Sequence, residues 1–143
     1  MIEVVKLPKE EFDLIVKDVH TAVFADTLDV NYFRYDFAMA TIHKEKLISY
    51  VLCTERSNEV IELSFGGTVP DERGFKSVES FHMFLRELSH EYSHAVFQVR
   101  NDNLPMLKLA LHMGFIISGV NNNVYGKTFV VFNYNLKEGV ENA

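Results

Sequence analysis

The sequence predicts an α/β domain in which helices flank a mostly antiparallel sheet. Three observations support this class. Apolar residues alternate between residues 35 and 41, apolar and β-branched residues fill the segment that follows, and short polar turns separate the segments up to residue 69. Apolar residues then recur at three- and four-residue steps between residues 78 and 88, as in an amphipathic helix. Beyond that helix, strand-like and helix-like segments alternate, so at least one connection must cross over the sheet.

The N-terminal part predicts a strand at Ile2–Leu7, closed by Pro8, and then a helix. Acidic residues occupy the first turn of this helix, where they complement the positive end of its dipole. Its apolar stripe consists of Phe12, Ile15, Val16, Val19 and Val23. Residues 25–31 are expected to form a loop or an irregular second helix.

Three strands of an antiparallel meander are expected next. They are residues 35–41, Leu47–Thr54 and Val60–Val69, with polar turns at Lys44–Glu45 and Arg56–Asn58. Gly66 and Gly67 interrupt the third strand. A glycine pair there predicts a β-bulge, or a place where a ligand approaches the backbone closely.

The second half predicts a helix, a strand, a short helix and a closing pair of strands. The helix presents Val78, Phe81, Phe84, Leu85 and Leu88, and the strands are His94–Val99, Phe115–Val120 and Phe129–Leu136. The predicted order is β-α-(α)-β-β-β-α-β-α-β-β, with about seven strands. We expect a single domain over residues 1–136 and a flexible polar tail over residues 137–143.

Composition excludes several classes of function. The chain has 20 acidic and 14 basic residues, a net charge of −6, which disfavours nucleic acid and suits a cationic partner. Cys53 is the sole cysteine and the six histidines form no metal-binding signature, so we expect no metal. No apolar run approaches the roughly 20 residues of a membrane-spanning helix. We therefore expect a cytoplasmic protein that does not associate with membranes.

The segment Asn103–Phe115 carries the strongest functional signal. It reads as a short amphipathic helix that ends at Gly114 and leads into a strand. Its layout resembles the acyl-CoA-binding helix of the GCN5-related N-acetyltransferase (GNAT) superfamily, Asn-x-x-(small or apolar)-x-x-(Leu or Phe)-Tyr-x-x-x-Gly-Phe. Asn103, Met106, Leu109, Gly114 and Phe115 match this pattern, and Ala110 occupies the tyrosine position. The expected element order is also that of the GNAT fold.

A second segment, Val69–Val78, resembles the pyrophosphate loop of the same superfamily, and Leu47–Tyr50 resembles a strand preceding it. In such a loop, backbone N–H groups at a helix N-terminus bind the diphosphate, and glycines let it approach. Lys76 and Val78 stand in two glycine positions of that loop, and Lys76 could supply charge instead. The resemblance implies an acetyl-CoA site formed by Val69, Arg73, Gly74, Phe75, Lys76, Ser77, Val78 and Asn103.

Each of these assignments has a structural alternative. Residues 69–78 could be a surface turn before a helix, and Asn103 could serve only as a helix N-cap. For catalysis, Glu62 is the candidate general base, because many family members carry a glutamate near this position. Tyr125 is the candidate acid in place of the missing helix tyrosine. The alternatives are a solvated strand glutamate and an ordinary loop aromatic.

The resemblance implies an N-acyltransferase that moves an acetyl group from acetyl-CoA directly to a primary amine. The acceptor would be a small molecule or a peptide, and a homodimer is left open. The alternative is a catalytically eroded GNAT-like binding or assembly protein, of a kind that occurs in phages. The loss of the helix tyrosine and of the two loop glycines is what such erosion would produce.

Overall fold

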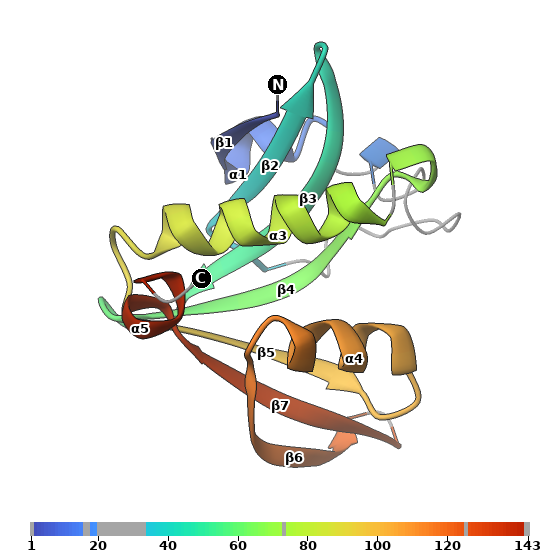
Figure 1. The fold of residues 1–143 in the computed structure, drawn as a ribbon, viewed down its shortest axis with the longest axis vertical. Coiled ribbons are helices and arrows are strands. Elements are labelled where there is room, and N and C mark those ends of the chain that lie inside the picture. The colour runs from blue at the N-terminus through green and yellow to red at the C-terminus, as the bar shows by residue number, and fades with distance from the viewer. Residues whose placement is uncertain (1, 16–17, 20–33, 73, 125, 142–143) are drawn as a thin grey trace.

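The computed structural model describes residues 2–15, 18–19, 34–72, 74–124 and 126–141. Within them the strands form one seven-stranded sheet in the order β1-β2-β3-β4-β5-β7-β6 (Figure 1). The strands are β1 (Glu3–Pro8), β2 (Phe37–His43), β3 (Lys46–Glu55), β4 (Val60–Thr68), β5 (His94–Arg100), β6 (Ile116–Val124) and β7 (Lys127–Asn135). The helices are α1 (Lys9–Phe12), η2 (Pro70–Glu72), α3 (Phe75–Leu88), α4 (Leu104–His112) and α5 (Leu136–Glu141).

All neighbouring strands pair antiparallel except β4 and β5, which run parallel. The connection between these two strands is α3, the predicted crossover helix. The β2–β3 turn falls at Lys44 and Glu45, which both have positive φ values, of 51° and 65°. Two central residues with positive φ suit the right-handed twist of a hairpin. The predicted α/β class with a mixed, mostly antiparallel sheet is confirmed.

Helices cover both faces of the sheet, and this explains the continuous apolar runs of its central strands. On the front face, α3, α4 and α5 pack over a core that includes Met39, Cys53 and Phe97. On the back face, Phe12 of α1 packs against a smaller cluster that includes Tyr50 and Leu52. Figure 1 shows α3 crossing in front of the sheet and α1 behind β2.

An aromatic cluster joins α4 to the C-terminal strands. Phe97 stacks on Phe132 at a centroid distance of 5.3 Å and meets Phe115 edge-on at 4.7 Å. Phe115 also lies 4.7 Å from Tyr134. The phenylalanine that closes the Asn103–Phe115 motif is therefore a core residue, and it fixes the end of α4 against the sheet.

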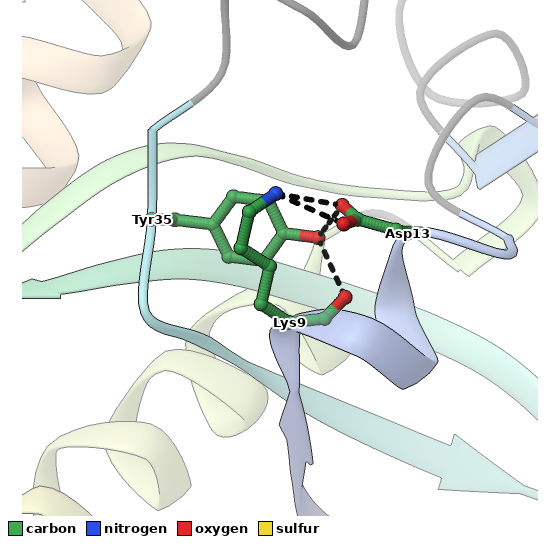
Figure 2. Close-up of polar contacts among 3 residues, drawn as sticks. All are labelled: Lys9, Asp13 and Tyr35. Carbon is green, nitrogen blue, oxygen red and sulfur yellow. Dashed lines mark hydrogen bonds and ion pairs between the residues drawn. The ribbon is translucent and has the colours of Figure 1, made fainter.

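A polar cluster ties α1 to the segment that enters β2 (Figure 2). The Tyr35 hydroxyl donates a hydrogen bond of 2.5 Å to Asp13 Oδ1, and Lys9 Nζ lies 2.9 Å from Asp13 Oδ2. The same ammonium lies 4.5 Å from the centre of the Tyr35 ring. Burial opposes ionisation of Asp13, but the Tyr35 hydrogen bond and the Lys9 charge outweigh it and lower the pKa of Asp13.

Two details of the prediction differ from the structure. The first helix is shorter than predicted. α1 ends at Phe12, and Ile15 of the predicted apolar stripe is 40% exposed. Val16 and Val23 lie outside the described residues. The predicted tail from residue 137 is instead α5 up to Glu141. Leu136 anchors this helix in the core, and Asn135 Oδ1 accepts hydrogen bonds from the N–H groups of Lys137 and Glu138, both of 3.1 Å.

Candidate functional site

The site begins where β4 and β5 separate. These strands pair at only three positions, the last of which joins Glu62 to Val96. Beyond this point they diverge, as Figure 1 shows. The side of β4 that faces β5 over residues 63–68 therefore has no strand partner in the described part of the chain. Unpaired backbone groups of this kind can bind an extended ligand as an added strand would.

A β-bulge shapes β4 along this open stretch. The register with β3 shifts between the pairs Val51↔Gly66 and Leu52↔Ser64. The two strands approach so closely that a Cβ atom on Gly66 would lie 2.7 Å from the Tyr50 carbonyl oxygen. The glycine is therefore required by the packing of backbone on backbone. This confirms the bulge that Gly66 and Gly67 predict.

A cavity of about 730 Å³ occupies the space between the diverging strands. Apolar side chains from α3, α4 and the strands line it: Leu63, Phe81, Phe84, Phe97, Val99, Met106 and Leu109. Polar groups lie around them: Ser49, Glu62, Ser64, Thr68, Ser77, Gln98, Arg100, Asn103 and Asn121. The size and the apolar lining with a few polar groups are typical of a small-molecule site.

The N-terminus of α3 borders this cavity. Gly74 precedes the helix with φ of 96°, a left-handed conformation that favours glycine, and no side chain caps the helix. The Ser77 hydroxyl donates to Thr68 Oγ1 at 2.9 Å, and Thr68 Oγ1 lies 2.8 Å from Ser49 Oγ. These hydroxyl contacts fasten the first turn of α3 to the ends of β3 and β4.

Three described residues of the predicted pyrophosphate loop, Val69, Lys76 and Val78, make contacts elsewhere. Lys76 Nζ lies 2.5 Å from Glu72 Oε2, and its ammonium lowers the pKa of Glu72 through this hydrogen bond. Val69 packs against the back cluster and Val78 against the front core. Phe75 begins α3, and Arg73 lies outside the described residues.

Asn103 caps α4 and also borders the cavity. Its Oδ1 accepts a hydrogen bond of 3.3 Å from the N–H of Met106, so it is the N-cap of α4. It also lines the cavity, together with Met106 and Leu109 of the same helix. Ala110, which occupies the tyrosine position, is 1% exposed and packs in the front core. Position 110 therefore supplies no acidic side chain.

The candidate base Glu62 lies at the point where the strands separate, and it lines the cavity. Its carboxylate forms an ion pair with Arg56. The candidate acid Tyr125 lies outside the described residues. Sequence reasoning missed Tyr50, which lines the cavity from β3. Burial raises the pKa of the Tyr50 phenol, so this hydroxyl keeps its proton at neutral pH.

Sequence reasoning also missed Gln98, whose Oε1 accepts a hydrogen bond of 3.1 Å from Asn121 Nδ2 beside the cavity. Polar residues at positions 98 and 100 alternate with buried Phe97 and Val99, and this alternation was the available signal. Burial raises the pKa of Cys53 to about 12, which fits a core residue. Among the described residues no cluster of histidine, cysteine or carboxylate side chains could hold a metal ion.

Solved structures of acetyltransferases share this fold. The ribosomal-protein-S18-alanine N-acetyltransferase of Escherichia coli aligns with 95% of the chain and 94% of its own, at a TM-score of 0.76 and 13% identity. A GNAT-family acetyltransferase of Bacillus cereus aligns with 94% of the chain and 97% of its own, at a TM-score of 0.72 and 19% identity. Arabidopsis thaliana NAA60 in complex with acetyl-CoA aligns with 96% of the chain and 99% of its own, at a TM-score of 0.73 and 12% identity.

The chain therefore has the fold of the GNAT acetyltransferases. No family sequence model matches it, and no curated protein sequence matches it significantly. In the described residues, no helix has both the length and the apolar character needed to cross a membrane.

Proposed function

We propose that this protein is an N-acetyltransferase that transfers the acetyl group of acetyl-CoA directly to a primary amine. The separation of β4 from β5 over a largely apolar cavity carries the proposal. Such a space fits a slender arm with amide groups, because one wall offers unpaired strand backbone and the other offers apolar side chains. Its likeness to the NAA60 structure that holds acetyl-CoA supports the same cofactor.

In this arrangement the pantetheine arm lies along residues 63–68 of β4, and the diphosphate lies at the N-terminus of α3. Gly74 allows close approach there, and the helix dipole favours negative charge. The sequence assigns Arg73 and Lys76 to the same phosphates. Lys76 would then exchange its pairing with Glu72 for the ligand. Arg100, at the end of β5, adds a cation to the cavity wall.

The reaction requires a neutral amine, a positioned thioester and a proton for the departing thiolate. The acceptor ammonium gives one proton to the Glu62 carboxylate, and the freed amine attacks the thioester carbonyl carbon. A C–N bond forms and the C–S bond breaks. The thiolate takes a proton from the acid and leaves as free CoA, and the second proton that the nitrogen loses on becoming an amide reprotonates the acid. Tyr125 is the proposed acid, and Tyr50 is a second candidate because it lines the cavity.

A binding protein without catalysis is the second candidate function. It is favoured by Ala110, whose methyl group packs in the core where the family has its tyrosine. Such a protein would retain the cavity and the cofactor without turnover.

Thermal unfolding with acetyl-CoA tests the proposal. At 100 times its dissociation constant a ligand adds about 2.7 kcal/mol, which raises the melting temperature by several degrees. Met106→Trp, which fills the cavity, should abolish the shift. Leu111→Trp, on the exposed side of the same helix, should keep it.

Absence of any shift with millimolar acetyl-CoA would refute the proposal. Release of free thiol in the presence of a panel of primary amines then separates the two candidates. Thiol release that depends on the amine supports the enzyme, and binding without release supports the binding protein.

A further inference from the structure

The ion pair between Arg56 and Glu62 is built on a fixed hairpin turn. The N–H of Arg56 donates to the Val60 carbonyl oxygen at 2.9 Å, and Ser57 Oγ accepts from the N–H of Val60 at 3.1 Å. The Glu59 carbonyl oxygen accepts from the N–H groups of Ser93 and His94, so the turn is also fastened to the start of β5. The backbone that carries Arg56 therefore cannot drift away from Glu62.

Glu62 lies where the cavity reaches the back face of the sheet. Its neighbours Ile61 and Leu63 are buried in the front core, so by strand alternation the Glu62 side chain is directed to the back. Glu62 is also the last β4 residue paired with β5. Gln98 and Asn121 line the same cavity. A carboxylate and two amide side chains thus border the place where an acceptor would meet the thioester.

The two partners of the ion pair differ in exposure. The Glu62 side chain is 19% exposed, whereas the Arg56 side chain is 59% exposed. A carboxylate with restricted access to water depends on a nearby cation, because leaving it unpaired is costly. The exposed guanidinium can return to water at little cost, since ion pairs with exposed partners contribute only about 0–1 kcal/mol. Another cation can therefore replace Arg56 more easily than Glu62 can be left alone.

We propose that Arg56 is a built-in cation that holds the acceptor's place at Glu62, and that an acceptor ammonium displaces it. This inference rests on the proposed function, because it identifies the acceptor as a cationic amine. Arg56 is then a specificity-determining residue. It holds the Glu62 side chain in place in the free protein, and it makes every cationic acceptor compete with an internal one. Neutral molecules of the same shape gain nothing at this site.

The test follows the Glu62 carboxyl carbon by NMR in protein labelled with ¹³C at the glutamate carboxyl position. The signal is assigned by its disappearance in Glu62→Gln. The protein, saturated with CoA so that no turnover occurs, is titrated with n-butylammonium chloride at fixed ionic strength. n-Butanol, with the same alkyl chain and no charge, is the ligand control. Arg56→Ala is compared with Arg86→Ala, an exposed arginine in the last turn of α3.

The Glu62 signal should respond to the ammonium and stay unchanged with n-butanol. Removing the competing cation in Arg56→Ala should lower the apparent dissociation constant by roughly two- to fivefold, whereas Arg86→Ala should match the wild type. An equal or higher constant in Arg56→Ala, or a Glu62 signal that never moves, would overturn the inference. Failure of CoA to bind would instead contradict the proposed function, and the amine titration on the free protein would still report the exchange at Glu62.

Discussion

Replacement of Gly66 by alanine tests the packing that opens β4 toward the cavity. The added Cβ would lie 2.7 Å from the Tyr50 carbonyl oxygen and 3.2 Å from both Cα and Cβ of Val51. Two of these three atoms belong to the backbone, so the steric clash can be relieved only if β3 and β4 move apart at the bulge. Overpacking of this kind costs about 1–3 kcal/mol.

Gly119→Ala is the matched control, because a Cβ there meets nothing within 4 Å and the residue also lies in a strand. Alanine at an unobstructed strand position is neutral or stabilises by up to about 1 kcal/mol. Urea unfolding of both variants and the wild type at pH 7 measures the difference in the free energy of unfolding. Equal midpoints for Gly66→Ala and Gly119→Ala would refute the reasoning, because the close approach at Gly66 would then carry no energy.

Three further predictions concern Phe97, Tyr35 and Lys76. Phe97→Ala should lower the free energy of unfolding by about 3 kcal/mol. This is near the low end for such truncations, because the ring already borders the cavity. An unchanged urea midpoint would contradict the stabilising role of its stacking on Phe132. Tyr35→Phe removes the hydrogen bond to Asp13 and should lower the free energy of unfolding by about 1 kcal/mol at pH 7, a value already reduced for the partial exposure of Asp13. Because the folded state lowers the pKa of Asp13, this contribution is complete above pH 3.8 and is lost as the pH falls through the folded-state pKa. The two proteins should therefore converge in acid-unfolding curves, and a constant gap would disprove the link to this carboxylate. Lys76→Glu should raise the dissociation constant of acetyl-CoA by about fivefold in calorimetric titration, whereas Arg86→Glu should leave this constant unchanged. Equal effects of the two substitutions would show that only the net charge of the protein matters.

Much of the fold could be predicted because local patterns and tertiary packing agree. The strands of the meander, the turn at Lys44 and Glu45 and the bulge at Gly66 can each be recognised from neighbouring residues alone. The C-terminal helix was missed because its anchor is tertiary. Leu136 is buried in the core, and this burial outweighs the polar composition of the residues that follow it.

The site was predicted less completely, for a physical reason. Ser77 and Asn103 were found because they stand in motifs with a local geometry, a helix N-terminus in each case. Tyr50 and Gln98 come from separate strands, and only the register of the sheet brings them to one cavity. The pairing of Glu62 with Arg56 depends likewise on the β3–β4 hairpin. The cofactor-binding and catalytic roles of all the predicted site residues, Arg73 and Tyr125 among them, stay predictions.

In the proposed function, acetyl-CoA lies between the diverging parts of β4 and β5. The most direct measurement is a titration of ¹⁵N-labelled protein with acetyl-CoA, followed through the backbone amide signals. We predict saturable shifts concentrated at residues 63–68 of β4, at the first turn of α3 around Ser77, and at the start of α4 around Asn103. Shifts confined to other surfaces, or no shifts at millimolar acetyl-CoA, would contradict this placement of the cofactor.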